Sequence, residues 1–282
     1  SSGEVRSWES SLPVIMGDLR DAGLDDLEVL VEHRLPLSSK RTDVILCGQH
    51  PRTGDPNYLV VELKQWARAQ ADPEDVELVH VDAYGDRPVL HPGRQVQNYV
   101  DYMVDFVRAL DGNPDAVKGA AYLHNAAESG VASLRLRPET QASRLFTADD
   151  RGRWLDYLCA QFAPDSGAIA ADALLSSAVA PSKQLMKLAA QEIQQREQFV
   201  LLDEQEVAYR LVLSAVQQAI RGDHKSVVIV TGGPGSGKSV IALSLLGELY
   251  RRRRTAEHAT GSKAFTETLR KVAGARNKRV QE

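Results

Sequence analysis

The sequence has few cysteines, few aromatic residues and no long apolar run. Only two of its 282 residues are cysteine, and Phe, Trp and Tyr together make up 6%. Cys47 and Cys159 have no close partner, which argues against a disulfide framework and favours a reducing compartment, with both side chains in the core. No apolar run approaches the ~20 residues of a membrane helix, and residues 1–10 lack the apolar centre of a signal peptide. We therefore expect a soluble, cytoplasmic protein without a membrane partner.

Positive charge is scarce in the first half of the chain and concentrated at its end. Residues 1–134 carry 12 Lys and Arg against 22 Asp and Glu, a balance of −10, while the whole chain carries −4. Residues 251–282 hold 10 Lys and Arg against 3 Glu. A basic end can contact a polyanion such as nucleic acid, although a solvated helical face explains the run at 251–254 at least as often.

The spacing of apolar residues predicts an α/β protein. Residues 7–23 have helical spacing, whereas 27–35, 42–48 and 58–66 are β-branched and apolar, with turn residues between the last two runs. An amphipathic pattern at 93–110 predicts a second helix, and 118–125 predicts a further strand. The predicted order is helix, three strands, helix, strand. We assign residues 1–133 to a first domain, 134–199 to a helical connector and 200–282 to the start of a nucleotide-binding domain.

The clearest motif is GGPGSGKS at residues 232–239, which satisfies G-x-x-x-x-G-K-[ST]. Glycines let backbone N–H groups wrap a phosphate closely, the lysine reaches the β- and γ-phosphates, and the serine hydroxyl ligates Mg²⁺ at a helix N-terminus. An apolar strand is expected before the loop and a helix after it. The predicted ATP-binding residues are Gly232, Gly233, Pro234, Gly235, Ser236, Gly237, Lys238 and Ser239.

Flanking segments extend this prediction. Gln205 lies upstream of the loop at the start of a helix and resembles the adenine-contacting glutamine of superfamily 1 helicases, although an ordinary helix N-terminal glutamine explains it too. Residues 258–274 resemble the second core strand and helix of the same kind of motor. A RecA-like core needs more residues than follow Leu202, so we expect an incomplete motor that binds nucleotide weakly and has no useful ATPase turnover.

A second set of residues forms the pattern D…E-x-K, with Asp43, Glu62 and Lys64. Side chains alternate along a strand, so Glu62 and Lys64 project from one face, and a hairpin between 42–48 and 58–66 brings Asp43 beside them. Two converging carboxylates make an oxygen site for Mg²⁺ or Mn²⁺, and the lysine can orient or deprotonate the attacking water. The competing interpretation is a surface ion pair, which is disfavoured because Glu62 and Lys64 interrupt an apolar run.

The predicted helix at 93–110 adds Gln95 and Tyr99, which are four residues apart and therefore on one face. The pattern Q-x-x-x-Y resembles that of RecB-like nucleases, where such residues support the site and touch the substrate backbone. Gln97 is a weaker candidate because it lies off this face.

Four further residues have two interpretations each. Glu9 and Glu32 are either additional carboxylates of the site or solvated acids. Trp66 is either a core or rim aromatic residue or a platform for a base. His91, before a proline, is either a turn residue or a catalytic group, and the first is favoured.

Several segments together resemble one bacterial family. The first group is SKRTDVILCG, YLVVELKQW, HPGRQVQNY and AYLHN, and the second is LLDEQ, GGPGSGKS and HATGSKAF. The family joins an N-terminal PD-(D/E)XK nuclease domain to a Schlafen group 3-like DNA/RNA helicase-type ATPase domain. The chain departs from the family pattern at one position: Thr42 precedes Asp43, where the family motif has proline before the aspartate. It implies a restriction-endonuclease-like α-β-β-β-α-β domain and the start of a RecA-like domain.

The resemblance also implies a function. It is Mg²⁺-dependent cleavage of nucleic acid, with DNA favoured over RNA, coupled to ATP-dependent translocation or sensing in defence against foreign DNA or in DNA processing. Two alternatives stay open. The first domain can be an inactive docking or nucleic-acid-sensing module with an ATP-driven switch, as its −10 charge suggests, and a small-molecule P-loop kinase is disfavoured. The sequence indicates neither the oligomeric state, nor whether cleavage is endo- or exonucleolytic, nor the polarity of translocation.

Overall fold

The computed structural model describes residues 2–179, 199–262 and 267, without the side chains of residues 2–9. The chain divides into two compact units, residues 1–180 and residues 181–282. Within the described residues, no helix combines the length and apolar character needed to cross a membrane.

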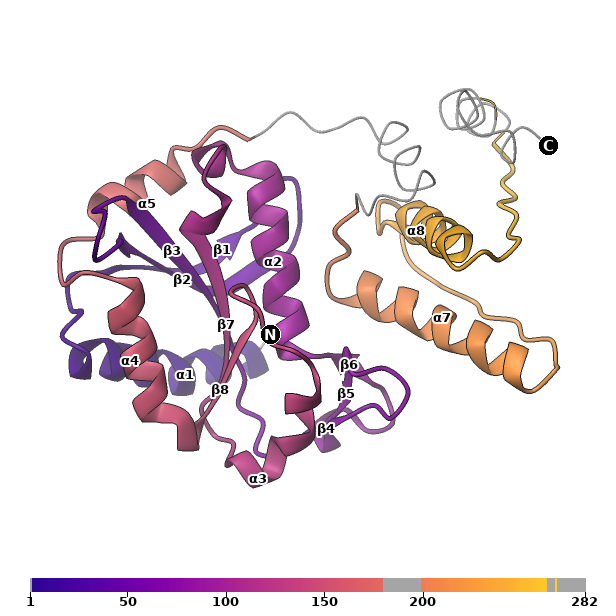
Figure 1. Cartoon of the computed structure of the whole chain (residues 1–282), viewed down its shortest axis with the longest axis horizontal. Helices are drawn as coiled ribbons and strands as arrows, with labels where there is room; N and C mark the ends of the chain where they lie inside the picture. Colours follow the sequence, from indigo (N-terminus) through magenta and orange to yellow (C-terminus); the bar gives the residue numbers. More distant parts are fainter. Residues whose placement is uncertain (1, 180–198, 263–266, 268–282) are drawn as a thin grey trace. The chain divides into compact units, whose positions relative to one another are not determined.

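A five-stranded mixed sheet forms the centre of the first unit (Figure 1). Its strands lie in the order β1 (Glu28–Arg34), β2 (Arg41–Gln49), β3 (Pro56–Leu63), β7 (Val117–Leu123) and β8 (Arg144–Thr147). The first three strands are antiparallel neighbours, whereas β7 runs parallel to β3 and β8 parallel to β7. The fold of this unit is therefore mixed α/β, and β8 is a strand that the sequence pattern did not predict.

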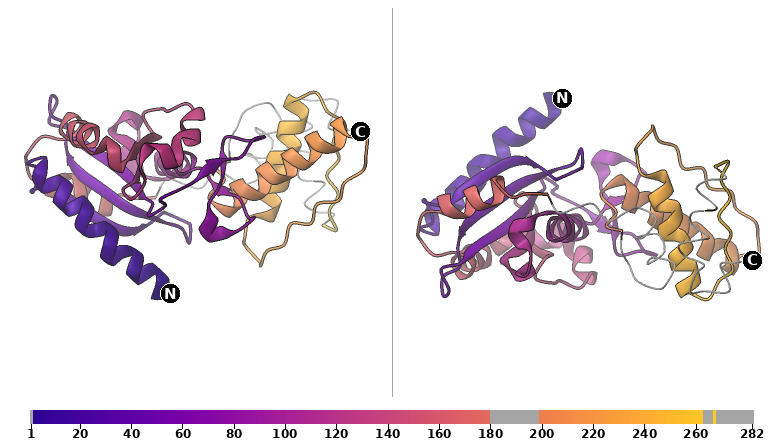
Figure 2. Two further views of the ribbon diagram at one scale, coloured as in Figure 1. Left: turned by 90° about the horizontal axis from the view of Figure 1, so that it is seen from below. Right: turned by 90° about the horizontal axis from the view of Figure 1, so that it is seen from above.

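Helices cover both faces of this sheet (Figure 2). On one face, α1 (Ser2–Asp21) and α4 (Arg151–Gln161) pack on alternate residues of the strands. The largest residues of this core are Ile15, Leu19, Leu24, Leu27, Leu46, Leu59, Tyr122, Phe146, Trp154, Leu158 and Phe162. Two further helices pack on the sheet: α2 (Pro92–Phe106) contacts β3 and β7, and α5 (Ala168–Leu175) contacts β2 and β3. Burial of one apolar stripe per helix explains why these segments are helical.

A small second sheet is inserted between β3 and α2. It consists of β4 (Gln70–Ala71), β5 (Leu78–His80) and β6 (Val89–Leu90), which pair in that order. Strands this short carry no readable alternation, so the sequence pattern did not predict them. The remaining regular segments of the unit are short: α3 (Glu128–Val131) and the 3₁₀ turns Asp82–Tyr84, Arg108–Leu110, Pro114–Ala116, Ala132–Leu136 and Ala148–Asp150.

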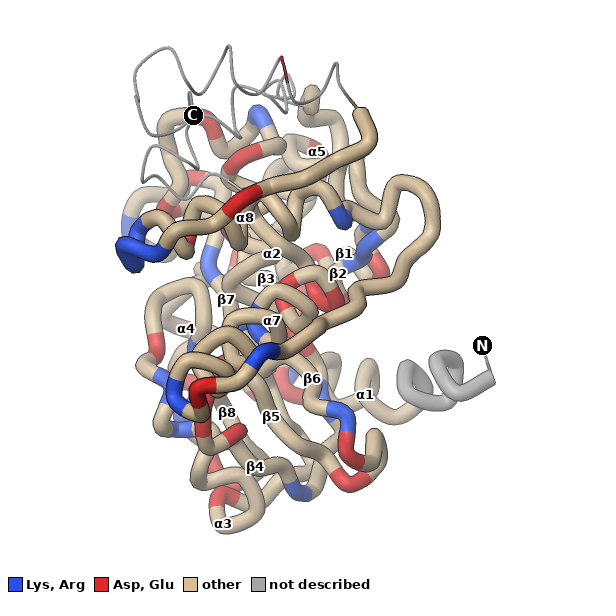
Figure 3. The backbone as a smooth tube through the Cα atoms, turned by 90° about the vertical axis from the view of Figure 1, so that its right-hand side faces the viewer, with Lys and Arg blue, Asp and Glu red and all other residues tan. Residues whose placement is uncertain are grey.

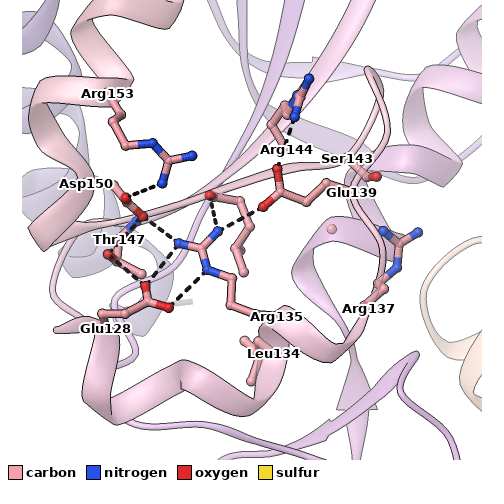
Figure 4. Close-up of polar contacts among 12 residues, drawn as sticks. Glu128, Leu134, Arg135, Arg137, Glu139, Ser143, Arg144, Thr147, Asp150 and Arg153 are labelled. Atoms are coloured by element: carbon pink, nitrogen blue, oxygen red, sulfur yellow. Dashed lines mark hydrogen bonds and ion pairs between the residues drawn. The ribbon is translucent and has the colours of Figure 1, made fainter.

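One arginine ties the segment after α3 to the end of β8 (Figure 4). The Arg135 guanidinium donates hydrogen bonds to the carboxylates of Glu128, Glu139 and Asp150 and to the Leu145 carbonyl oxygen. These carboxylates raise the pKa of Arg135 further above its usual range despite partial burial. The side chain therefore acts as a charged clamp within the fold.

Residues 134–179, which the sequence analysis placed in a connector, fall within the first compact unit. They contribute β8, α4 and α5, and β8 extends the main sheet. The rest of the predicted connector lies mostly outside the described residues. Cys47 is buried as expected, but Cys159 is exposed, so its expected core position was wrong.

In residues 199–262 of the second unit, the helices α7 (Glu204–Arg221) and α8 (Lys238–Arg251) pack against each other. The strand expected before the phosphate loop is not formed: residues 225–230 are irregular, and Val227 and Ile229 are 88% and 80% exposed. A strand requires a neighbour for its N–H and C=O groups, and the described residues of this unit supply none. The arginine run at 251–254, coloured blue in Figure 3, follows at the end of α8.

Candidate active site

Three carboxylates lie in a row across the first three strands. In the antiparallel pairing, Val44 lies opposite Val61, so the preceding Asp43 and the following Glu62 are neighbours. On the other side of β2, Val31 of β1 pairs with Val44, and His33 pairs with Thr42. Glu32, which lies between them, is therefore level with Asp43. The hairpin that the sequence predicted thus brings Asp43 and Glu62 together.

Lysine and glutamine complete this cluster. The Lys64 Nζ donates to Glu62 Oε1 at 2.6 Å and to Gln95 Oε1 at 3.0 Å. The Gln95 Nε2 in turn donates to the Tyr99 hydroxyl at 3.0 Å. Helix α2 therefore places the predicted pair Gln95 and Tyr99 next to Lys64, which directly follows β3, and Gln95 links the two.

Burial governs the charges of the cluster. Asp43 Oδ2 accepts the Leu63 N–H at 2.8 Å, and desolvation raises the pKa of Asp43 above its usual value, with the Glu32 charge adding to the rise. Glu62 is 3% exposed. Although burial alone disfavours an ammonium group, the carboxylates of Glu62 and Asp43 raise the pKa of Lys64, so this lysine is positively charged. One cation thus faces two carboxylates, with Glu32 beside them.

The cluster opens into a pocket of about 950 Å³. Its lining comes from α1, the ends of β1, β2 and β3, and the inserted segment: Ser11, Glu32, Ser39, Lys40, Arg41, Asp43, Glu62, Leu63, Lys64, Gln65, Trp66, Ala83 and Tyr84. The pocket volume is that of a typical ligand site, and acidic and basic side chains share its wall. The lining therefore suits a charged ligand better than an apolar one.

Glu32 has an unusual backbone. Its φ of 51° lies in the left-handed region, which side-chain-bearing residues rarely adopt. Its carboxylate pairs with Arg41 at 3.3 Å at a solvent-exposed position. This third carboxylate therefore lines the pocket but is balanced by an arginine. The side chain of Glu9, the other candidate, lies outside the described residues.

A polar chain that the sequence analysis missed borders the pocket. Gln65 Nε2 donates to Ser11 Oγ at 3.1 Å, and Ser11 Oγ lies 3.0 Å from His124 Nε2. The ring continues to Asn125 Oδ1 at 3.1 Å from its Nδ1. Isolated Ser, Gln and His residues carry no motif, so nothing in the sequence pointed to this contact between α1 and the end of β7.

Two residues that were considered less strongly prove to be structural. His91 is 2% exposed and caps α2 by accepting the Gly93 N–H at 3.0 Å. Gln97 contacts Asp101 and Thr140, so it points away from the lysine cluster.

Magnesium ions are held by one or two carboxylates together with water and phosphate oxygens. Among the residues that the structure describes, no group of three or more His, Cys, Asp or Glu could hold a metal ion. Asp43, which is partly buried, and Glu62, which is buried, nevertheless place two carboxylates side by side on paired strands. This donor set fits a hard divalent cation that shares its remaining ligand positions with a substrate.

In the second unit, the loop at 232–237 leads directly into α8. Gly235 and Gly237 have φ values of 75° and 84°, which explains their glycines. The Lys238 Nζ, at the first position of α8, donates to the carbonyl oxygens of Gly232 at 2.6 Å and Gly233 at 2.7 Å. The lysine is therefore folded back over the loop.

Gln205 contacts this loop from α7. Its Nε2 donates to the Ser236 carbonyl oxygen at 3.1 Å, and its Oε1 accepts the Leu202 N–H at 3.2 Å. The structure thus brings the upstream glutamine and the loop together. The predicted second strand and helix at 258–274 lie mostly outside the described residues.

Comparison with known proteins bears on the second unit. Residues 225–282 match the family described as Schlafen group 3, DNA/RNA helicase domain. The resemblance of this segment to Schlafen group 3 is thereby confirmed, while the nuclease resemblance of the first unit stays a prediction. No curated protein and no solved structure matches the chain.

Proposed function

We propose that the first unit is a Mg²⁺-dependent nuclease, which the chain joins to a helicase-type ATPase segment. The observation that carries this proposal is the cluster of Asp43, Glu62 and Lys64 on two paired strands, with Gln95 hydrogen-bonded to the lysine. The family match of residues 225–282 supports nucleic acid as the substrate class, since that family is described as a DNA/RNA helicase domain. We favour DNA over RNA and a role in defence or DNA processing, as the resemblance implies.

In this proposal, Asp43 and Glu62 would hold the cation, which when bound would supply an activated water and neutralise charge on the scissile phosphate. The Lys64 ammonium donates hydrogen bonds to the water or to a phosphate oxygen, because its raised pKa keeps it protonated. Gln95 orients that ammonium, and Tyr99 orients Gln95 through the bond between their side chains.

For the second unit, we propose ATP and Mg²⁺ as ligands of the loop at 232–239. Lys238 would exchange its bonds to the Gly232 and Gly233 carbonyls for phosphate oxygens, and Ser239 would ligate the cation. Gln205, which already touches the loop, would contact the base.

The test is cleavage of labelled single- and double-stranded DNA and RNA by the intact chain in Mg²⁺ or Mn²⁺, with EDTA as the blank. We expect cleavage that Asp43→Ala and Lys64→Ala abolish. Gln97→Ala is the matched control, because this glutamine lies on the same helix but points away from the lysine. Undiminished cleavage in both alanine variants would refute the assignment.

A second candidate function is a nuclease-like module that binds partners without cutting. The specific observation in its favour is the 2.6 Å pair between Lys64 and Glu62, in which the lysine already neutralises one of the two carboxylates. The −10 balance of residues 1–134 also disfavours a polyanion without added cations. Direct metal titration separates the two functions, because a docking module needs no divalent cation.

A further inference from the structure

One wall of the pocket is aromatic. Trp66 follows the end of β3, and Tyr84 ends the 3₁₀ turn of the inserted segment. Their ring centroids are 6.2 Å apart and their planes stand at 80° to each other, and both side chains line the pocket. Tyr84 is 49% exposed, whereas a core aromatic such as Trp154 is fully buried. This aromatic corner, Trp66 and Tyr84, is therefore only partly used for packing.

The aromatic corner lies next to the proposed reaction centre. The Lys64 Nζ is 5.2 Å from the centroid of the Trp66 ring and 2.6 Å from Glu62 Oε1. A nucleotide whose phosphate reaches Lys64 would thus have its base within reach of these rings.

The same pocket provides positive charge. Lys40 and Arg41, at the start of β2, line it together with Lys64. The Arg41 side chain is 58% exposed, and its partner Glu32 is also partly open to water. Of the three cations, Arg41 is the exposed one. Surfaces that hold unpaired nucleic acid combine positive side chains, which contact phosphates, with aromatic rings, which contact base faces.

We propose that the aromatic corner stacks on an unpaired base, so that this site acts on single-stranded nucleic acid. The inference rests on the proposed function for its placement at a cleavage site. In a duplex, neighbouring bases cover both faces of each base, whereas an unpaired base leaves a face open to a protein ring. Stacking on Trp66 or Tyr84 therefore discriminates by strand state and not by sequence.

The test is equilibrium binding by the intact chain. The probe is a short single-stranded DNA with one 2-aminopurine, compared with the same strand in a duplex, both in Ca²⁺ so that cleavage is avoided. We expect tighter binding of the single strand, with 2-aminopurine fluorescence changed on contact. Trp66→Ala and Tyr84→Ala should each weaken single-strand binding about 5- to 100-fold and leave duplex binding unchanged.

Two further variants serve as controls. Trp66→Phe should retain most of the affinity, because the ring face is kept. Leu136→Ala, at an apolar side chain 68% exposed outside the pocket, should have no effect. If Trp66→Ala lowers the folded fraction, Tyr84→Ala decides, because an exposed turn side chain contributes little to packing.

The outcomes separate this inference from the proposed function. Ring-dependent single-strand binding without cleavage in Mg²⁺ would support the stacking and refute the nuclease. Cleavage with equal affinity for both probes, unchanged in Trp66→Ala and Tyr84→Ala, would overturn the stacking and leave the nuclease standing. Absence of binding to either probe would also overturn the stacking.

Discussion

At the scale of single residues, His91 shows how a buried hydrogen-bond pattern selects one protonation state. Its Nδ1 accepts the Gly93 N–H and its Nε2 lies 3.1 Å from the Leu134 carbonyl oxygen. Only the neutral ring, with its proton on Nε2, satisfies both contacts. Burial accordingly lowers the pKa of His91 to about 4 from 6.5.

This depressed pKa predicts a loss of stability on acidification. Below pH 6.5 the unfolded chain takes up a proton on His91 that the folded chain refuses until about pH 4. The cost approaches about 3 kcal/mol across that window. Urea unfolding of wild type and His91→Gln at several pH values measures it, since glutamine retains a donor and an acceptor without titrating. Parallel pH profiles for the two proteins would contradict the prediction.

For Asp43 we expect the opposite dependence of stability on pH. Its pKa is raised by burial, so its contribution to stability is present below its ordinary pKa of 3.8 and is lost as pH rises through the folded value. At neutral pH, Asp43→Asn should therefore stabilise the fold, by about 0.5–2 kcal/mol as is typical when a functional charge is removed. Thermal unfolding at pH 7 and at low pH tests this, and the two proteins should converge on acidification.

The site residues differ in how well a sequence reveals them. Asp43, Glu62 and Lys64 were predictable as neighbours because strand alternation and a turn determine which side chains share a face. Ser11 and Tyr84 were not, since they reach the pocket from α1 and from the inserted segment, and only tertiary packing brings them there. The protonation of Lys64 likewise depends on burial, which sequence does not specify.

At the scale of secondary-structure elements, α2 positions the site through one of its faces. Gln95 and Tyr99 lie on the face toward Lys64, whereas Gln97 bonds to Asp101 and Thr140. Helical spacing made this face predictable. Two features were not predictable: the pairing of β8 with β7, and the absence of the strand expected at 226–230. Short or isolated strands depend on their neighbours for hydrogen bonds.

The orientation of α2 predicts a contrast between two neighbouring glutamines. Gln95→Ala removes an acceptor of the Lys64 ammonium and should lower cleavage about 10- to 100-fold, as loss of an orienting partner does in metal sites. Gln97→Ala should leave the cleavage rate unchanged. Single-turnover rates on one DNA substrate measure both, with circular dichroism as the check on folding. Equal rates for the two variants would show that the helix does not position the lysine.

At the scale of the whole molecule, the first unit has a hydrophobic core built from its own residues alone. The cluster that joins α1, the main sheet and α4 lies entirely within residues 1–180. The predicted first domain ends at residue 133, because the pattern of apolar residues becomes helical and irregular from about Leu134 onward. Trp154, Leu158 and Phe162, which lie beyond that position, are almost completely buried in this core.

Residues 1–180 should therefore fold without the second unit. Expressed alone, this segment should unfold cooperatively and show the near-ultraviolet circular dichroism of packed aromatic residues. A segment ending at residue 133 should not, since it lacks the core residues Trp154 and Leu158 of α4 and Phe162, which directly follows that helix. A non-cooperative transition for residues 1–180 would show that its core depends on the remainder of the chain.

The central claim is that Asp43 and Glu62 hold a divalent cation. The most direct measurement is titration of the intact chain with Mn²⁺, followed by electron paramagnetic resonance of the free ion. We predict a bound ion that is lost in Asp43→Asn and in Glu62→Gln and retained in Ser239→Ala, which alters only the phosphate loop. Mn²⁺ binding that is absent from wild type, or that persists unchanged in both carboxylate variants, would contradict the account.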